Sequence, residues 1–453
     1  MLKRKITALL ESWFHASAGR ALLLTGARQV GKTTVVRAFA AERGLALAEV
    51  NFYENRDAVS LVNEARDVDE LLFRLSALTH MTIRPDETLL FLDEVQECQD
   101  MLTWVKFLIE KRGLRIVLSG SLLGVDAFLD ARSLPVGFAR TVEMFPLDFE
   151  EFGWACGLPE GMLAHALEAV AARRAVGSFE HEQLLRAWRT YLLVGGMPAA
   201  VQAHVETSQL GAARAVQNDI TALYKADIVK YVEDKVEARQ VKMVYEAIPG
   251  QLNAPSKRFK YARLGKNLRF ANMETAFDWL EAAGVALCVP RTGSVSFPSA
   301  LAEDRSSIKL FMNDVGLLTS QLMGDADIDV LGAAAAFNYG SIYENAVAQE
   351  LRAQGFAPRY YFSTKRGEVD FVVEDSARGI AVPVEVKSGK DYRRHSALSN
   401  VLAAGEVATW ACVLCDGNAT FSEGRAYIPV YLSGKLRELA FLWEKPMPPV
   451  TTG

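Results

Sequence analysis

The sequence predicts an α/β protein of several domains. Near each end of the chain, apolar strand-like runs alternate with segments of helical spacing, whereas the middle is rich in Ala, Leu, Glu and Arg at helical spacing. A length of 453 residues is enough for two to four domains. We expect a doubly wound core at residues 1–155, a helical connector or lid at 156–245, a winged-helix-like domain at 246–325 and a second α/β domain at 335–453.

The composition is that of an ordinary globular chain. Hydrophobic residues make up 50% and charged residues 23%, and the net charge is −5, so any nucleic-acid contact has to come from local basic patches. The longest apolar runs fall well short of the roughly 18–20 residues that cross a bilayer. The five cysteines are scattered, and Cys412 and Cys415 lie in a strand-like run that favours buried structural thiols over a redox pair. We therefore expect a cytoplasmic protein that does not bind a membrane.

The first motif is a phosphate-binding loop. The stretch "ALLLTGARQVGKTTVVRAFA" is an apolar strand, a glycine-bearing loop and a helix, and it matches G-x-x-x-x-G-K-[ST] completely. Lys32 would reach the β and γ phosphates of ATP, and the Thr33 hydroxyl would bind Mg²⁺ at the helix N-terminus. The residues expected to contact the nucleotide are Gly26, Ala27, Arg28, Gln29, Val30, Gly31, Lys32, Thr33 and Thr34.

Two further strands supply the remaining parts of this site. "ETLLFLDEVQE" is a buried strand that ends in Asp93, which would hold Mg²⁺ through water, and Glu94, which would polarise the attacking water. "LRIVLSGS" ends in Ser119, placed to sense the γ-phosphate, and in Ser121, for which a helix N-cap is an equal alternative. "TVEMFPLDFEEF" then supplies a strand and a helix start that complete the core.

The middle of the chain is helical, and "VGGMP" at 194–198 is its clearest break. "PSKRFKYARLGKNLRFANMETAFDWLEAAGVALCVPRTGSVSF" predicts a helix, a turn, a second helix and a two-stranded wing. The second helix exposes Glu274, Asp278 and Glu281, the wrong sign for a DNA major groove. Phosphate contact and a solvated face both remain open for the basic residues before it, which are Lys257, Arg258, Lys260, Arg263, Lys266 and Arg269.

The C-terminal part carries charged residues on strand-like runs. A helix "IYENAVAQELRAQG", with Glu344 expected in its first turn, precedes "PRYYFST", "EVDFVVE" and "IAVPVEVKS", then a helix "SALSNVLAAG" and a strand "TWACVLCDG". This order resembles a restriction-endonuclease-like core, and the set Asp370, Glu385 and Lys387 is similar to the PD-(D/E)xK nucleases. Glu344, Asp370 and Glu385 would then bind Mg²⁺, and Lys387 would position the attacking water. Structural salt bridges, or a nuclease relic that only binds, are the alternatives.

As a whole, the chain resembles the AAA-type ATPases of bacteria and archaea that carry a C-terminal domain of unknown function. The resemblance lies in "GARQVGKTT", "LLFLDEVQ", "MFPLDFEEF", "YLLVGGMPAAV", "YENAVAQEL", "YYFSTKRGEVDFVV" and "PVEVKSGK". It implies an AAA-type ATPase domain that binds ATP and Mg²⁺, and it leaves a homo-oligomeric ring open. Such proteins often carry a basic residue after the glycine corresponding to Gly137, where this chain has Phe138. Arg132 and Arg140 remain candidates for an arginine finger, with a surface role as the alternative.

These features support two functions of different classes. The first is an enzyme that couples ATP hydrolysis to metal-dependent cleavage of nucleic acid, with DNA favoured. The alternative is an ATP-driven switch or scaffold whose nuclease-like domain only binds nucleic acid or protein. The acidic second helix counts against a third idea, a DNA-binding regulator that acts through the winged helix.

Overall fold

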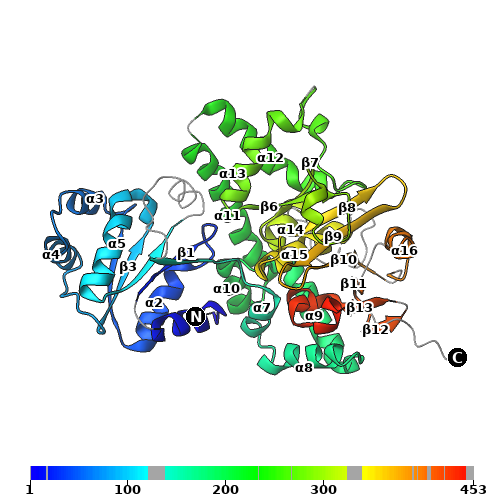
Figure 1. Cartoon of the computed structure of the whole chain (residues 1–453), viewed down its shortest axis with the longest axis horizontal. Helices are drawn as coiled ribbons and strands as arrows, with labels where there is room; N and C mark the ends of the chain where they lie inside the picture. The colour runs from blue at the N-terminus through cyan, green and yellow to red at the C-terminus, as the bar shows by residue number, and fades with distance from the viewer. Residues whose placement is uncertain are drawn as a thin grey trace. The chain divides into compact units, whose positions relative to one another are not determined.

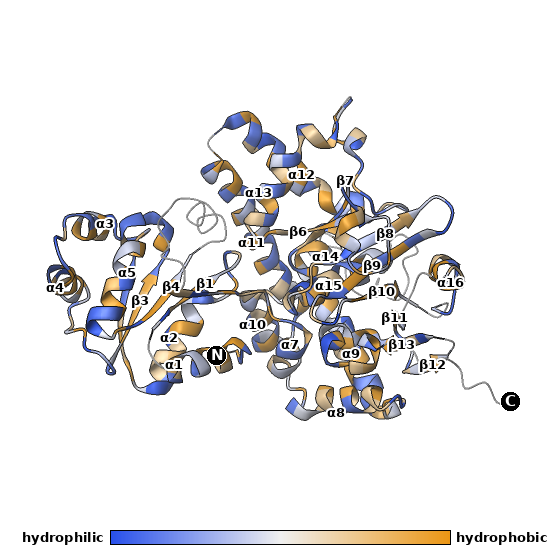
Figure 2. Ribbon diagram, in the orientation of Figure 1, coloured by the Kyte–Doolittle hydropathy of each residue, from blue (hydrophilic) through white to orange (hydrophobic). Residues whose placement is uncertain are grey.

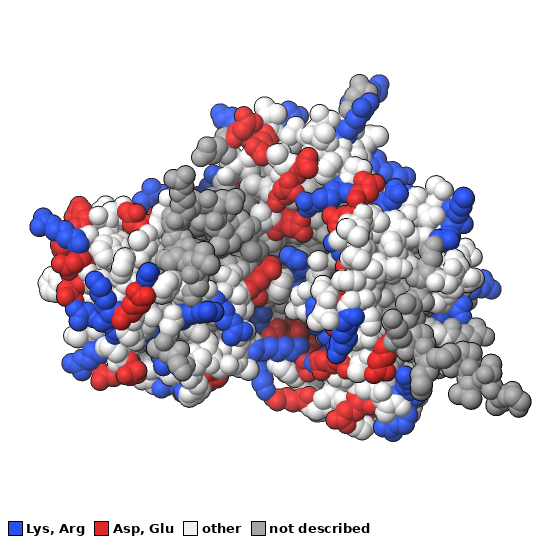
Figure 3. All heavy atoms as spheres, in the orientation of Figure 1, with Lys and Arg blue, Asp and Glu red and all other residues white. Residues whose placement is uncertain are grey.

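The computed structural model describes residues 2–16, 19–120, 138–232, 234–266, 268–323, 339–389, 392–394, 396–405, 410–422 and 424–444 (Figure 1). The chain forms two compact units. The first is Met1–Phe145 with Ala282–Gly284, and the second is Pro146–Glu281 with Val285–Gly453. Basic and acidic side chains are interspersed over the face shown in Figure 3, in keeping with the small net charge.

The first unit is built on a five-stranded parallel sheet in the order β2-β3-β4-β1-β5. Its strands are β1 (Ala21–Thr25), β2 (Ala46–Asn51), β3 (Thr88–Asp93), β4 (Arg115–Ser119) and β5 (Ala139–Glu143). Its helices are α1 (Ile6–His15), α2 (Lys32–Arg43), α3 (Arg56–Asn63), α4 (Val68–Leu78) and α5 (Gln99–Arg112), with a 3₁₀ turn, η1 (Val95–Glu97), after β3. The predicted α/β core with a parallel sheet is confirmed.

Helices cover this sheet because both of its faces are apolar. Every residue of β1 and β3 is buried, as expected of central parallel strands. Alternate residues such as Leu23, Leu90 and Ile116 pack into one core with α3, α4 and α5, while α2 contacts β2, β3 and β4. In Figure 2, β3 is hydrophobic along its length, and the helices around it carry hydrophilic patches. The parallel register brings the carboxyl ends of β2, β3 and β4 to one edge.

The second unit begins with helices, as the sequence predicted for its middle part. The helices are α7 (Phe149–Ala155), α8 (Glu160–Ala171), α9 (Ser178–Val194), α10 (Pro198–Thr207), α11 (Leu210–Tyr231) and α12 (Lys235–Leu252). Asp148 and Glu151 form a capping box that starts α7 directly after β5. "VGGMP" separates α9 from α10, because two glycines end the first helix and Pro198 begins the second.

The second unit also contains an eight-stranded mixed sheet in the order β12-β13-β11-β10-β9-β8-β6-β7. Its strands are β6 (Ala286–Thr292), β7 (Glu303–Met312), β8 (Arg359–Ser363), β9 (Gly367–Asp375), β10 (Ile380–Lys387), β11 (Ala411–Cys415), β12 (Thr420–Ser422) and β13 (Arg425–Pro429). The predicted hairpin of β9 and β10 is confirmed as an antiparallel pair. A two-stranded wing was expected in "GVALCVPRTGSVSF", and only its first strand is present there, as β6. Residues 293–298 form no strand, and β6 pairs instead with the later β7 and extends this sheet through a parallel contact with β8.

The segment before β6 differs from the predicted pair of helices. The second helix is present as α13 (Glu274–Ala282), with Ala276, Phe277 and Leu280 buried. Where the first helix was expected, the described residues form two 3₁₀ turns, η2 (Tyr261–Arg263) and η3 (Phe270–Asn272). Just before them, the Phe259 amide donates to the Ile308 carbonyl at 2.8 Å, which joins this segment to β7.

The remaining elements of the second unit are α14 (Val315–Met323), α15 (Tyr339–Ala353), α16 (Ser396–Ala403) and the 3₁₀ segments η4 (Ser299–Ala302), η6 (Val430–Glu438) and η7 (Ala440–Trp443). Because α15 begins at Tyr339, Glu344 lies in its second turn, and the prediction of a first-turn position was wrong. Cys412 and Cys415 are buried on β11 with free thiols, as predicted for structural cysteines. Among the described helices, none has the length and apolar character needed to span a bilayer.

Candidate functional site

The phosphate-binding loop joins β1 to α2 in the first unit. Gly26 has a φ of 142°, and a Cβ at this position would collide with the Met144 carbonyl oxygen. Gly31, at the N-cap of α2, has a φ of 94°. Only glycine adopts both conformations without strain, so the two glycines of the motif set the path of the loop. Ala27 and Val30, between the two glycines, are both buried.

The Lys32 side chain folds back onto the phosphate-binding loop. Its Nζ donates to the carbonyl oxygens of Gly26 at 2.9 Å and Ala27 at 3.0 Å. Burial lowers the pKa of this ammonium, and the nearby Glu94 and Asp93 offset part of that effect. A phosphate is a stronger acceptor for the ammonium than two neutral carbonyls, so this side chain is placed to exchange one for the other.

Asp93 is the centre of the polar network beside the loop. Its Oδ2 accepts from the Thr33 hydroxyl at 3.0 Å, and its Oδ1 accepts from the Ser119 hydroxyl and from the Glu94 amide at 3.1 Å. Asp93 as a whole residue is 4% exposed. The structure therefore brings together Thr33, Asp93 and Ser119, three of the predicted site residues, from α2, β3 and β4.

Glu94 follows Asp93 with a left-handed backbone, at a φ of 51°. Its Oε2 accepts a hydrogen bond from the Gln96 side chain, and the residue is half-buried. This backbone conformation is uncommon for a residue other than glycine, and it lies between the end of β3 at Asp93 and the start of η1 at Val95. Gln96 was not predicted, and it fixes the orientation of the candidate water-polarising residue.

Two more residues of this site were missed. The Asn51 side chain, at the end of β2, donates to Asp93 Oδ2 at 3.2 Å. Its position as a polar residue at the carboxyl end of a strand was a signal that could have identified it. The Arg4 guanidinium donates to the carbonyl oxygens of Val30 at 2.9 Å and Phe145 at 2.8 Å, which ties the loop to the segment after β5. No local pattern marks this long-range contact.

Other predicted residues of the first unit lie outside the hydrogen bonds of this network. Thr34 and Gln29 are exposed, and the Arg28 guanidinium lies 6.0 Å from the centre of the Tyr53 ring. Arg140 is exposed on β5. Arg132, Ser121 and Gly137 lie outside the described residues, so the arginine-finger prediction stays a prediction.

The donor set beside the loop fits Mg²⁺. A threonine hydroxyl and a carboxylate are hard oxygen donors, and Thr33 Oγ1 and Asp93 Oδ2 already lie 3.0 Å apart. Magnesium keeps several waters and needs only one or two protein ligands when phosphate oxygens supply others. Thr33 and Asp93 are therefore the residues that would hold the ion.

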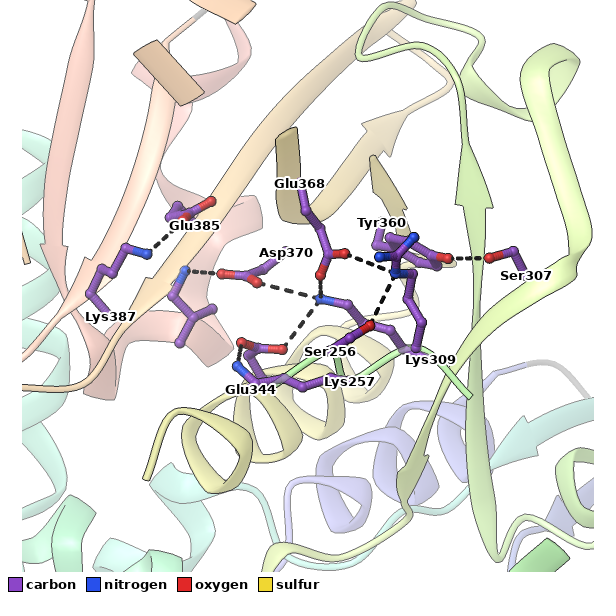
Figure 4. Close-up of polar contacts among 12 residues, drawn as sticks. Ser256, Lys257, Ser307, Lys309, Glu344, Tyr360, Glu368, Asp370, Glu385 and Lys387 are labelled. Carbon is purple, nitrogen blue, oxygen red and sulfur yellow. Dashed lines mark hydrogen bonds and ion pairs between the residues drawn. The ribbon is translucent and has the colours of Figure 1, made fainter. Parts of the chain in front are cut away.

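The second unit contains a buried cluster of charged side chains around Lys309 of β7 (Figure 4). The Lys309 side chain is 0% exposed, and its Nζ lies 2.9 Å from Glu368 Oε1, 3.4 Å from Glu344 Oε2 and 3.4 Å from Asp370 Oδ1. Lys257 forms an ion pair with Glu344 Oε1. We call Lys257, Arg258, Lys309, Glu344, Glu368, Asp370, Glu385 and Lys387 the charge cluster.

The predicted D…E-x-K set lies within this cluster. Asp370 on β9 accepts from the Val386 amide of β10 at 2.9 Å, so the hairpin itself orients its carboxylate. Lys387 Nζ lies 2.7 Å from Glu385 Oε1, which confirms that the two side chains of β10 share one side. Figure 4 shows this pair apart from the carboxylates that surround Lys309. Sequence reasoning did not find Lys309, and it did not connect Lys257 or Glu368 with the cluster.

The pKa shifts in the cluster follow from burial and from its charge pairs. Burial, followed by the Asp370 charge, raises the pKa of Glu385 to about 8. The same two causes raise the pKa of Glu344. Burial opposes ionisation of Asp370 as well, but Lys309 and Lys257 hold the pKa of this carboxyl below its usual value. Burial opposes the charge on Lys309, yet Glu344, Asp370 and Glu368 keep the pKa of this ammonium well above its ordinary value.

The predicted ligand set of Glu344, Asp370 and Glu385 does not fit a metal ion in this arrangement. Both oxygens of Glu344 and both of Asp370 already pair with protein donors. Glu385 Oε2 is the exception, because it is buried without a hydrogen-bond partner. Within the part of the chain that the structure describes, no three His, Cys, Asp or Glu side chains are arranged to hold a metal. Lys257 and Lys309 form ion pairs with the carboxylate oxygens that a metal ion would need as ligands.

The basic segment before α13 divides into two groups. Lys257 and Arg258 belong to the charge cluster. Arg258 Nε lies 3.5 Å from Glu368 Oε2, and the Arg258 guanidinium lies 4.1 Å from the centre of the Phe362 ring. The four basic residues that are exposed are Lys260, Arg263, Lys266 and Arg269. A solvated face or phosphate contact therefore remains open for these four alone.

Comparison with known protein families matches three parts of the chain. Residues 18–153 match an AAA domain, residues 185–327 match a domain of unknown function (DUF8612), and residues 339–432 match another domain of unknown function (DUF4143). The first match includes the phosphate-binding loop, Asp93 and Ser119, and it supports an AAA-type ATPase domain in the first unit. No curated protein matches the chain.

Among solved structures, the chain is similar to a Walker-type ATPase of Pyrococcus abyssi, with 15% identity and a TM-score of 0.42 over 71% of this chain and 96% of that one. It is also similar to the ORC1 protein of Aeropyrum pernix, solved in complex with DNA, with 14% identity and a TM-score of 0.28 over 72% of this chain and 92% of that one.

Proposed function

We propose that this chain hydrolyses ATP with Mg²⁺ and uses the cycle to switch a second unit that binds nucleic acid, with DNA favoured. The observation that carries the ATPase part is the network of Thr33, Asp93 and Ser119 next to the Lys32 ammonium. The AAA domain match over the same residues supports it.

Each residue of the loop has a separate task in this mechanism. Lys32 would leave the Gly26 and Ala27 carbonyls to neutralise the β and γ phosphates. Mg²⁺, held by Thr33 and Asp93, would neutralise charge on the phosphate oxygens. Glu94, held by Gln96, would orient and polarise the attacking water. Ser119 would report the γ-phosphate to Asp93 through their shared hydrogen bond.

Phosphate release by the full chain, with ATP and Mg²⁺, tests this part of the proposal. Lys32→Ala is expected to lose nucleotide binding, because the ammonium is the loop's main positive charge. Glu94→Gln is expected to keep binding and to lose turnover by about 10²- to 10⁴-fold, the usual contribution of a general base. Lys111→Ala, an exposed lysine of α5, is the matched control. Full turnover in Glu94→Gln would reject the role of Glu94.

The second unit is proposed to bind rather than to cleave, because lysines already neutralise the carboxylates that a metal-dependent nuclease would use. Lys260, Arg263, Lys266 and Arg269 are the exposed cations that would contact phosphates. The expected result is duplex binding whose affinity falls with the logarithm of the salt concentration. Replacing all four with Gln would reduce that slope, and an unchanged slope would contradict this surface. Assembly with further copies of the chain stays a prediction.

Cleavage of nucleic acid is the second candidate, and one observation favours it. Glu385 Oε2 is buried without a hydrogen-bond partner, next to the ion pair of Glu385 Oε1 with Lys387. This oxygen could therefore accept a hydrogen bond or bind a metal ion. Purified protein would be incubated with supercoiled plasmid, single-stranded DNA and RNA, with Mg²⁺ or Mn²⁺, with and without ATP. Cleavage that disappears in Lys387→Ala would establish the nuclease. ATP turnover without cleavage would support the binding unit.

A further inference from the structure

We propose that the Lys309 ammonium is a built-in cation that closes the charge cluster to divalent metal ions, and that removing its charge opens a site for a hard cation such as Mn²⁺. The inference goes beyond the proposed function. It depends on contacts within the second unit alone, so loss of ATP turnover would not overturn it.

The position of Lys309 is the first part of the argument. Its Nζ is within 3.4 Å of carboxylate oxygens from Glu344 on α15 and from Glu368 and Asp370 on β9. An ammonium has three N–H donors, which matches three carboxylates around one point. The whole side chain is buried, with Nζ 5.3 Å from the centre of the Tyr360 ring. Water therefore cannot replace this charge, and the carboxylates depend on it.

Charge balance is the second part of the argument. Ion pairs join the acidic side chains of the cluster to basic ones in four groups: Lys257 with Glu344, Arg258 with Glu368, Lys309 with three carboxylates, and Lys387 with Glu385. The acidic members are Glu344, Glu368, Asp370 and Glu385, and the basic members are Lys257, Arg258, Lys309 and Lys387. With all eight groups ionised, the four negative and four positive charges cancel, and protonation of Glu385, whose pKa is raised to about 8, removes one of the negative charges. In either state the cluster has no net negative charge for a divalent ion to neutralise. Adding one would bury two excess positive charges, which is costly in a low dielectric.

The same geometry explains why the site would open without the lysine charge. Methionine in place of Lys309 would keep an unbranched apolar side chain of similar length but would leave three buried carboxylates without their shared cation. Hard divalent cations bind carboxylate oxygens at about 2.0–2.6 Å, so the three groups would have to close by roughly 1 Å around an ion. Glu385 Oε2, buried and unpartnered on the neighbouring strand, is an additional acceptor at this end of the sheet.

Mn²⁺ binding to the full chain without nucleotide, measured by equilibrium dialysis and by electron paramagnetic resonance of the free ion, tests the inference. We expect Lys309→Met to bind one more Mn²⁺ per chain than the wild type, and Lys309→Met with Asp370→Asn to lose that ion again. Lys365→Met, at an exposed lysine in the turn between β8 and β9, should bind as the wild type does. Any Mn²⁺ held at the phosphate loop is common to all variants and cancels in the comparison.

Two further measurements keep the test decisive if Lys309→Met folds poorly. Wild type and Glu385→Gln should bind equal amounts of Mn²⁺, because the wild-type cluster is closed. Lys309→Gln, whose amide can still donate to a carboxylate, should gain more thermal stability from Mn²⁺ than the wild type gains. Mn²⁺ lost from the wild type on Glu385→Gln, or a folded Lys309→Met with wild-type stoichiometry, would overturn the inference.

Discussion

Glu385 on β10 shows how one buried carboxyl can make stability depend on pH. Glu385 is 5% exposed. Its Oε1 forms an ion pair with Lys387, and its Oε2 has no hydrogen-bond partner. Burial raises its pKa from 4.5 to about 8, so the folded chain favours the protonated form. The stability that this preference contributes is fully present below about pH 4.5 and is lost as the pH rises through about 8.

Glu385→Gln tests this dependence, because glutamine stays neutral at every pH. We expect the free energy of unfolding of the wild type to fall more steeply than that of Glu385→Gln between pH 5 and 9. Each unit of pKa difference corresponds to about 1.4 kcal/mol. Urea unfolding, followed by circular dichroism at a series of pH values, measures the two slopes. Glu42→Gln, at an exposed position of α2, is the control, and identical slopes for wild type and Glu385→Gln would contradict the prediction.

At the scale of elements, the break between α9 and α10 packs tightly against two other segments of the second unit. We call this contact the joint. Gly195, with a φ of 69°, lies against Asp314 before α14, and a Cβ there would collide with the Asp314 carboxylate. The Gly196 amide donates to Asp314 Oδ2 at 2.6 Å, and the Gly196 carbonyl accepts from the Leu147 amide at 2.7 Å. Two adjacent glycines therefore let three segments of the second unit meet through their backbones.

Gly196→Ala should destabilise the second unit strongly. The added Cβ would collide with the carbonyl of Leu147 and would lie 2.8 Å from its amide nitrogen, and backbone cannot move aside as a flexible side chain can. We expect a loss of about 3 kcal/mol or more in the free energy of unfolding, measured by urea titration. Gly211→Ala, at an exposed position of α11 with open space around it, should be neutral or stabilise by about 0.5–1 kcal/mol. Equal stability of the two variants would contradict this account of the joint.

The same elements show what sequence patterns can and cannot predict. The phosphate loop, the strand ending in Asp93 and the hairpin of β9 and β10 are local patterns, and each was predicted correctly. "VGGMP" was identified as a helix break, but its packing against Asp314 depends on a residue more than a hundred positions away. Lys309 lies 35 residues from Glu344 and 61 from Asp370. Its role arises from strand order in the sheet, which periodicity does not encode.

At the scale of the whole molecule, the two units have separate sheets and separate cores. One apolar core packs β1, β3 and β4 against α3, α4 and α5, entirely within the first unit. Another packs β9, β10 and β11 with α16, entirely within the second. The residues predicted to contact the nucleotide, which are Gly26 to Thr34, Asp93 and Ser119, all lie in the first unit, so the binding energy is expected to add to the stability of that unit.

Scanning calorimetry of the full chain should therefore show two unfolding transitions, of which ADP with Mg²⁺ raises only one. A ligand at 100 times its dissociation constant adds about 2.7 kcal/mol to the unit that binds it. For a domain of this size, each kcal/mol shifts the midpoint by about 2–4 °C. Lys32→Ala should abolish the shift, and Lys111→Ala should keep it. A single transition that moves as a whole with the nucleotide would show that the units unfold together, and the energy of nucleotide binding would then stabilise the charge cluster as well as the loop.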